Sequence, residues 1–310
     1  MLRTFGVILC LLILLQGEVW SGSTYRFLRN DVSARSAALA GSFLAITDDP
    51  NSLFYNTAAL STVQGPKGSI GFFKQLLDIN TGYVSYAQEF SDLGTFGAGV
   101  VYTNYGSFTR TDDVGTILGS FNAGDLALSV GYSNILEQNL YYGVSLKFIY
   151  SSIDSYSSSG IAGDLGVMYL VPESRLTLGA SIRNLGAQLD PYATTREDLP
   201  LDLMIGASIV PRGIPLLLNV SFNRLNEGDT FGDRFRDFSL GGEFTLSKVL
   251  QVRFGYDNEQ RRDLKIGTSA GLAGFAGGIG ITISEYRLDY ALSSLGKAGS
   301  VHRISIGASL

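Results

Sequence analysis

From about residue 67 to Leu310, the chain repeats short segments in which apolar and polar residues alternate. Alternation with a period of two predicts β-strands that have one apolar face and one polar face. The connections between these segments are alternately tight and long, which is typical of a transmembrane barrel with short turns at one end and long loops at the other. We predict about fourteen antiparallel strands, at residues 68–75, 82–90, 95–105, 124–133, 140–151, 161–171, 175–184, 201–210, 214–223, 238–246, 249–257, 263–273, 276–291 and 301–310.

The two faces of each segment differ in size and charge. In the segment 140–151, Leu146 and Phe148 lie on one face and Lys147 on the other. A charge that faces lipid at mid-depth costs about 2–4 kcal/mol, so we expect the apolar faces to contact hydrocarbon and the charged faces to line the lumen. Six charged residues are predicted to be luminal: Lys147, Asp164, Arg183, Glu243, Arg253 and Lys265. We also predict an ion pair between Arg183 and Asp164 across the turn at 172–175.

Residues 1–21 are predicted to be a secretory signal peptide. They begin with a short basic stretch (MLR), and an unbroken apolar run follows from Phe5 to Leu15. A membrane-spanning helix needs about 20 apolar residues, whereas the apolar core of a signal peptide is shorter. Because Cys10 is the only cysteine and lies in this run, the mature chain would contain no disulfide and no cysteine ligand for a metal.

Residues 22–66 differ from the rest of the chain, because their apolar residues come close to helical spacing. The run from Arg35 to Ile46 predicts a short helix, with Asp31 and Ser33 as candidates for its N-cap. The inward faces of the predicted barrel, 67–310, carry many glycines, at positions 143, 166, 179, 206, 241, 255, 267 and 271. Glycine weakens a strand and often marks a close approach of other backbone, so we predict that 22–66 folds into the lumen as a plug. The alternative is that these glycines relieve crowding where the sheet curves.

Composition and charge argue against several classes of function. The net charge is −5 and the pI is near 5.0, and no basic patch dominates, so we expect no nucleic-acid partner. His302 is the only histidine, and no Asp or Asn stands at a spacing that would orient it toward Ser284, Ser305 or Ser309 in a catalytic triad. We therefore predict a protein that is not an enzyme and has no catalytic residues and no cofactor.

One group of oxygen-bearing side chains deserves a separate test as a cation site. Asp48, Asp49, Asn51 and Asn56 could offer ligands, but their spacing matches no calcium-binding loop. Asx turns account for these residue types without a metal. The glycines between 271 and 280 lack the following helix that a phosphate-binding loop requires. We predict no metal site and no nucleotide site.

Two stretches of the chain carry a family resemblance, residues 33–60, which include SARSAALAG and AITDDPNSLFYNTAAL, and residues 288–305, which include LDYA and HRIS. They resemble the N-terminal signature and the closing strands of the PorV/PorQ family, which is itself similar to the FadL-type transporters. The N-terminal positions are Arg35, Gly41, Asp48, Asp49, Pro50, Asn51 and Asn56, and the closing positions are Asp289, Tyr290, His302 and Arg303. Two residues depart from the pattern: Thr57 stands where proline is usual, and the chain ends in Leu310 rather than an aromatic residue.

The resemblance implies a fourteen-stranded, plugged barrel in the bacterial outer membrane, with lipid around its outer surface. Better-characterised members of the family belong to the type IX secretion machinery, so it also implies docking of partner subunits or of secreted cargo with C-terminal sorting domains. The alternative is a FadL-like channel for the uptake or export of hydrophobic small molecules. A channel of that kind needs an apolar pocket between plug and wall, whereas a docking barrel needs a broad external surface.

Overall fold

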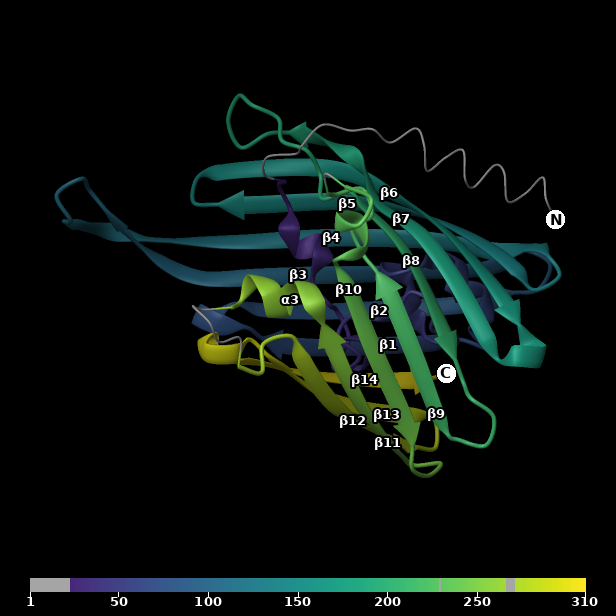
Figure 1. The fold of residues 1–310 in the computed structure, drawn as a ribbon. Helices are drawn as coiled ribbons and strands as arrows, with labels where there is room; N and C mark the ends of the chain where they lie inside the picture. Colours follow the sequence, from purple (N-terminus) through teal and green to yellow (C-terminus); the bar gives the residue numbers. More distant parts are fainter. Residues whose placement is uncertain (1–22, 229, 266–270) are drawn as a thin grey trace.

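The computed structural model describes residues 23–228, 230–265 and 271–310. Fourteen antiparallel strands close into a barrel, in which consecutive strands pair and β1 pairs with β14 (Figure 1). The strands are β1 (Lys67–Lys74), β2 (Asn80–Phe90), β3 (Gly94–Thr111), β4 (Ile117–Glu137), β5 (Leu140–Ile153), β6 (Tyr156–Val171), β7 (Leu176–Asp190), β8 (Asp202–Ile209), β9 (Leu216–Phe222), β10 (Phe238–Thr245), β11 (Leu250–Asp257), β12 (Phe275–Ile283), β13 (Tyr286–Ser294) and β14 (Ser300–Ser309). The predicted fold class is confirmed. The predicted signal peptide, residues 1–21 with Cys10, lies outside the described residues.

Two of the predicted strands are wrong. The strand expected at 263–273 is replaced, in its described part, by the end of helix α3 (Asn258–Asp263) and by loop, because the Asp257 side chain accepts a hydrogen bond from the Gln260 backbone and starts a helix. The strand expected at 276–291 is two strands, β12 and β13, joined by a tight turn at 284–285 in which Ser284 has a φ of 52°. The two errors cancel in the strand count.

The loops expected at 106–123 and 152–160 are mostly strand. β3 continues to Thr111 and β4 begins at Ile117, so the two form a long hairpin that projects well beyond the barrel (Figure 1). The strands β3 to β7 contain 14 to 21 residues, whereas β8 to β14 contain 7 to 10. We call the end with the connections 191–201, 223–237 and 258–274 the long-loop end, and the opposite end the short-turn end.

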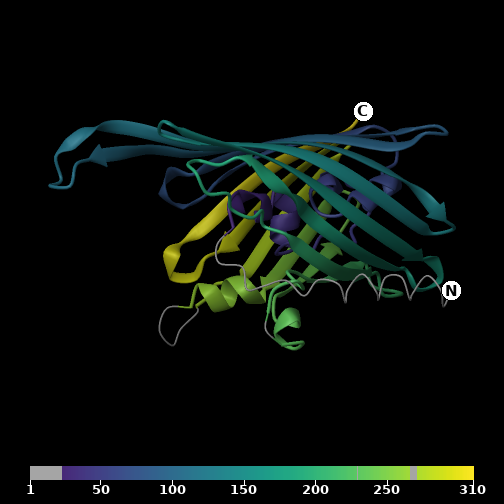
Figure 2. The same ribbon diagram turned by 90° about the horizontal axis from the view of Figure 1, so that it is seen from above.

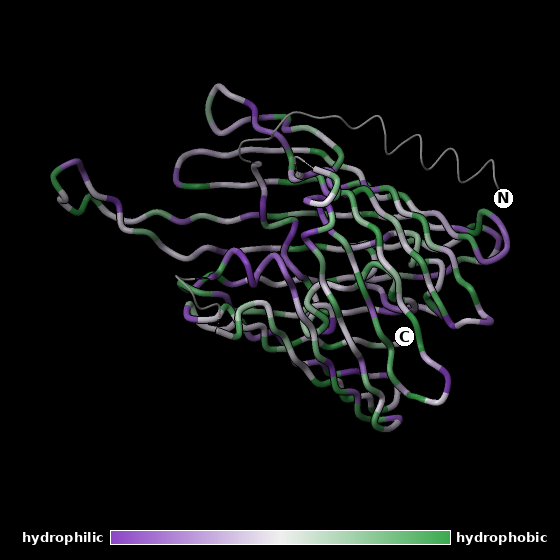
Figure 3. Tube along the Cα trace, in the orientation of Figure 1, coloured by the Kyte–Doolittle hydropathy of each residue, from purple (hydrophilic) through white to green (hydrophobic). Residues whose placement is uncertain are grey.

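The two faces of the wall follow the predicted alternation. On β4, Leu128 and Val130 are 43% and 58% exposed, whereas Ala127 and Ser129 between them are 3% and 4% exposed. Hydrophobic stretches are concentrated along the strands, and hydrophilic stretches at the loops (Figure 3). No helix in the described part of the chain combines the length and the apolar character needed to cross a membrane. The alternating exposure places the outward apolar rows in a belt around the barrel, of the kind that faces hydrocarbon.

Residues 23–66 lie inside the barrel, between the strands near the middle of the chain and those near its C-terminal end (Figure 2). The segment contains η1 (Arg26–Arg29), α2 (Ala34–Ala38), η2 (Pro50–Phe54) and η3 (Thr57–Thr62). Ser33 caps α2 as predicted, but the helix is shorter than expected, because Ala40 and Gly41 adopt positive φ angles of 52° and 75°. α2 packs against β11 to β14, whereas η3 packs against β3 to β6.

Candidate functional site

At several glycines of the inner wall, the segment 23–66 packs directly against the backbone of the strands. A Cβ added to Gly143 would lie 2.3 Å from the Ala58 nitrogen, and one added to Gly255 would lie 2.5 Å from the Ala40 nitrogen. A Cβ on Gly166 would lie 2.2 Å from Asn56 Oδ1. Real Cβ atoms do not come this close to other atoms, so glycine is required at these positions for the segment to pack where it does. Of the glycines singled out from the sequence, 267 lies outside the described residues and Gly271 is in a loop.

Arg35 of α2 joins the luminal segment to the wall through charge. Its guanidinium donates to both carboxylate oxygens of Glu243 on β10, at 2.9 and 2.7 Å, and Nη1 donates to Asp49 at 3.0 Å. Glu243 also accepts from Arg253 on β11 at 2.6 Å. Bidentate pairs between arginine and carboxylate are among the strongest polar contacts in proteins. Arg35 thus connects two parts of the luminal segment to the wall.

The network continues to β13. Asp289 forms ion pairs with Arg253 at 2.7 Å and with Arg287 at 3.0 Å, and Arg287 also lies 3.4 Å from Glu243. Three arginines thus face three carboxylates, those of Asp49, Glu243 and Asp289. Burial opposes the charged form of Arg35, but the carboxylates of Glu243 and Asp49 outweigh this effect and raise its pKa above the ordinary arginine value. We call these six residues the α2 network.

The predicted ion pair between Arg183 and Asp164 does not form. Asp164 pairs with Lys147 at 2.8 Å, and Arg183 pairs with Asp202 of β8 at 2.8 Å. The cause is an irregularity in the pairing of β6 with β7 between Gly163 and Leu165, which places the Asn184 backbone nitrogen 2.8 Å from Asp164 Oδ1. A register shift of this kind leaves no signal in the alternation of the sequence.

Lys265 is not luminal. It follows α3 at the long-loop end and is exposed, because the described residues beside it form the end of α3 and a loop rather than the predicted strand. The other five predicted luminal charges, Lys147, Asp164, Arg183, Glu243 and Arg253, are nearly fully buried on the inward face.

The N-terminal signature residues have local structural partners. Asp49 Oδ1 accepts hydrogen bonds from the backbone and side chain of Asn51, which in turn accepts from Ser85 of β2 at 2.8 Å. Asp48 pairs with Lys67 at 2.6 Å, and Pro50 is the first residue of η2. Asn56 accepts from the Ala58 nitrogen and donates to the carbonyls of residues 44 and 167. These carboxylates and amides hold the fold of the segment together.

The closing-strand residues divide between the two faces. Asp289 and Arg303 point inward, and the Arg303 guanidinium stacks 4.5 Å from the centre of the Phe73 ring. Tyr290 and His302 point outward and share a hydrogen bond of 2.7 Å between the tyrosine hydroxyl and Nδ1. His302 is also bonded to Ser300, so its two ring nitrogens have partners on the outer face of the wall.

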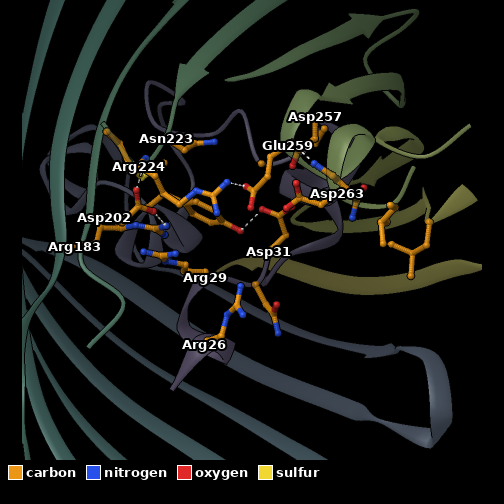
Figure 4. Close-up of a pocket in the computed structure, with 18 residues that line it drawn as sticks. Arg26, Arg29, Asp31, Arg183, Asp202, Asn223, Arg224, Asp257, Glu259 and Asp263 are labelled. Carbon is orange, nitrogen blue, oxygen red and sulfur yellow. Dashed lines mark hydrogen bonds and ion pairs between the residues drawn. The ribbon is translucent and has the colours of Figure 1, made fainter. Parts of the chain in front are cut away.

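A charged cavity of about 420 Å³ opens at the long-loop end of the lumen. Figure 4 shows Arg224 and Glu259 pointing toward one another there, with Arg183 beside Asp202. Burial raises the pKa of the Glu259 carboxyl, although Arg224 opposes this shift. The further lining groups include Arg26, Arg29, Asp31, Asp257 and Asp263. Apart from Arg183, sequence reasoning did not single out these residues as functional, because they come from elements and connections far apart in the sequence that no local pattern brings together.

A second, smaller cavity of about 210 Å³ lies at the short-turn end, beside Asp49, Lys67 and Arg287. Between the two cavities the lumen is packed, and Phe43 and Leu53 at its centre are at most 1% exposed. The lumen therefore has charged groups at both ends and an apolar cluster between them.

A closed fourteen-stranded barrel, with an outward apolar belt and a segment of its own chain inside, is the fold of a bacterial outer-membrane protein. No protein-family model matches the chain, and no curated protein matches its sequence. Solved structures do match. A mutant of the TodX monoaromatic hydrocarbon channel is 14% identical, with 90% of this chain and 99% of that chain covered and a TM-score of 0.64.

Two further matches agree with this fold. The Pseudomonas putida toluene transporter TodX is 16% identical over 94% of this chain and 98% of its own, with a TM-score of 0.61. A FadL homologue from Pseudomonas aeruginosa is 10% identical over 94% and 100%, with a TM-score of 0.58. The chain therefore has the fold of the FadL-like outer-membrane channels over almost its whole length.

Proposed function

We propose that this protein is an outer-membrane channel for small hydrophobic molecules. The observation that carries the proposal is a lumen filled by residues 23–66, whose centre is an apolar cluster that includes Phe43, Leu53 and Leu60. A lumen packed in this way is unsuited to bulk flow of water and polar solutes. Compounds that gain free energy on contact with apolar side chains are the class that such a centre favours. The fold shared with a toluene transporter supports the same substrate class.

The charged mouth adds a condition to this proposal. A hydrophobic molecule that enters from the long-loop end first meets the cavity around Arg224 and Glu259, where polar groups bind one another rather than the solute. Such a cavity offers a hydrophobic molecule no favourable contact. The apolar centre therefore has to supply the selectivity for hydrophobic over polar molecules. The segment 23–66 also has to shift for a molecule to pass, since it contacts the wall at glycine positions without any gap.

The test is uptake by cells that carry the full chain in their outer membrane. We expect faster uptake of radiolabelled toluene than in cells without the protein, and unchanged uptake of a labelled disaccharide. A variant with Ser61→Cys and Ser133→Cys allows a covalent lock, because these two hydroxyl oxygens lie 2.6 Å apart and join the luminal segment to β4. Oxidation of the variant should leave toluene uptake unchanged, because the disulfide fixes only the η3 side of the segment, whereas the α2 side remains able to shift. Equal gains for toluene and disaccharide, or no gain for toluene, would refute the proposal.

A second candidate function, docking in protein secretion as in the PorV/PorQ family, is favoured by the projecting hairpin. At its tip Val114, Ile117 and Leu118 are 86%, 72% and 61% exposed, which is costly for apolar side chains outside a membrane unless a partner covers them. Replacement of residues 108–121 by a two-residue Asn-Gly turn removes the pairs beyond Ser107 and Asn122 and should leave the barrel intact. Docking predicts that secretion of cargo with C-terminal sorting domains stops in the native host while toluene uptake continues. Normal secretion by the shortened protein would exclude this function.

A further inference from the structure

The lipid-facing belt is not uniformly filled, and one hollow in it lies over β1, β2, β3 and β14. At its centre is the outward Gly82, which stands between the outward side chains of Phe72 on β1 and Tyr102 on β3. The hollow has a volume of about 650 Å³, and its outward lining is otherwise apolar: Ile70, Phe72, Val84, Val100, Tyr102, Ile304 and Ile306. We call it the apolar hollow.

Packing within the wall does not demand glycine at position 82. A Cβ there would meet only the Gly71 carbonyl oxygen, at 3.8 Å, which is an ordinary van der Waals distance. This contrasts with Gly143 and Gly255, where the luminal segment occupies the space. The hollow at Gly82 is therefore open space on the side of the wall that faces hydrocarbon, and an acyl chain is the group that fills such space in a membrane.

A second hollow, of about 600 Å³, lies beside the first and nearer the long-loop end. It surrounds the outward Gly124, and the Tyr102 hydroxyl lies 3.4 Å from the position of a Cβ on this glycine. Beside the apolar Leu126, its lining offers several hydrogen-bonding side chains: Tyr102, Asn104, Ser107, Asn122, Tyr150 and Ser152. We call it the polar hollow.

The two hollows share Tyr102 and meet where the belt ends. β2 and β3 remain paired up to Asn80 and Asn104, and β3 continues from there, through a bulge, into the projecting hairpin. Tyrosine is typical of the boundary between hydrocarbon and head groups. One amphipathic molecule could therefore place its chain in the apolar hollow and its head in the polar hollow.

The chemistry of the polar hollow selects the head group. The side chains that line it include amides, hydroxyls and two tyrosine rings, and no Lys or Arg is among them. The Asp125 carboxylate is not part of this surface, because it is buried on the inward face, where it accepts hydrogen bonds from Tyr105 and Ser151. An anionic phosphate would find no cation there, whereas sugar hydroxyls would find donors, acceptors and aromatic faces. We propose that the two hollows together bind one neutral glycolipid in the membrane leaflet at the long-loop end.

The acyl chain alone gives the protein little preference for one lipid over another, because lipid tails are as apolar as the wall. Selectivity should therefore come from the head group, and the fit of the chain should add dispersion contacts. The test is native mass spectrometry of the detergent-purified full chain with digalactosyl diacylglycerol or phosphatidylglycerol of the same acyl chains. We expect the glycolipid to bind with a dissociation constant about tenfold lower than that of the phospholipid.

Three variants locate the binding. Gly82→Leu fills the apolar hollow and should remove retention of the glycolipid, whereas Asn122→Leu should remove only the preference for the sugar head. Gly277→Leu is the matched control, because Gly277 is an outward glycine of β12 whose added Cβ would meet only the Arg253 carbonyl oxygen, at 3.7 Å. It should bind as the wild type does. Equal binding of the two lipids to the wild type, or unchanged binding by Gly82→Leu, would overturn the proposal.

Discussion

The two halves of the luminal segment are held to the wall by different forces. On the α2 side, Arg35 reaches β10 through two charged hydrogen bonds to Glu243. On the η3 side, Leu60 and Ala58 lie directly over the bare backbone of β3 and β5, at Gly97 and Gly143. The first attachment depends on matched charges in a dry site, and the second depends on the absence of side chains from the wall.

This difference shows how one short segment can stay attached to the wall on one side and move away from it on the other. Apolar packing onto glycine cannot be loosened without a change in volume, so the η3 side acts as the permanent anchor. Ion pairs can exchange partners, and two carboxylates of the α2 network, those of Glu243 and Asp289, each have more than one arginine partner. We expect the α2 side to be the part that yields when a molecule passes.

The largest effect should come from breaking the α2 network. Glu243→Ala leaves Arg35 and Arg253 facing one another without their shared carboxylate. Loss of one member of a buried ion pair costs about 3–5 kcal/mol, because an uncompensated charge remains. Thermal unfolding in detergent, followed by far-ultraviolet circular dichroism, measures the change. A double variant, Arg35→Met with Glu243→Leu, should recover part of the loss, and a loss by Glu243→Ala below about 1 kcal/mol would contradict the role of the network.

A smaller effect is expected on the η3 side. Gly143→Ala places a methyl group 2.3 Å from the Ala58 nitrogen, and overpacking of this kind costs about 1–3 kcal/mol. Gly277→Ala is the control, since its methyl group would lie 3.7 Å from the nearest atom outside its immediate neighbours. The same unfolding measurement should separate the two variants. If the two variants lose the same amount of stability, packing of the luminal segment does not require glycine at position 143.

The charged mouth at the long-loop end should also respond to pH, through Glu259. Burial raises its pKa in the folded protein, so its protonated form is favoured by folding. The associated stability is complete below the ordinary glutamate pKa of about 4.3 and is lost as pH rises through the folded value. Glu259→Gln removes this titration, so the variant should gain melting temperature relative to the wild type as pH rises above that point. A constant difference, or a relative gain by the wild type, would contradict this assignment.

The smallest effect should come from Lys265→Ala. Lys265 is exposed after α3, and surface substitutions of this kind change stability by no more than about 0.5 kcal/mol. Lys147→Ala serves as its comparison, because Lys147 is buried with Asp164 as its ion-pair partner. Equal melting temperatures for the two variants would show that the inward charge contributes no more to stability than the exposed one.

The sequence was sufficient for features that follow from lipid on one side of a sheet. The faces of Phe148 and Lys147 follow from alternation, because a one-residue error would turn a charge toward hydrocarbon. It failed where alternation carries no information. At 263–273 the residues alternate by chance, whereas Asp257 just before them starts a helix.

The candidate site was predicted only in part. The signature residues Arg35 and Asp49 were singled out, but their link to Glu243 joins positions far apart in the sequence, and no local pattern records it. The partners of Arg183 were missed because of the bulge beside Gly163. The charged mouth was missed because Arg224 and Glu259 come together only when separate loops fold over the lumen.

The most direct test of the account is whether Ser61→Cys and Ser133→Cys form a disulfide in the intact outer membrane. Cys10 is the only other cysteine of the chain and lies in the predicted signal peptide, so the result has little background. With the two hydroxyl oxygens 2.6 Å apart, we predict rapid oxidation in air and faster migration on a non-reducing gel. Two free thiols that a water-soluble maleimide labels in the folded protein would show that the segment lies outside the barrel.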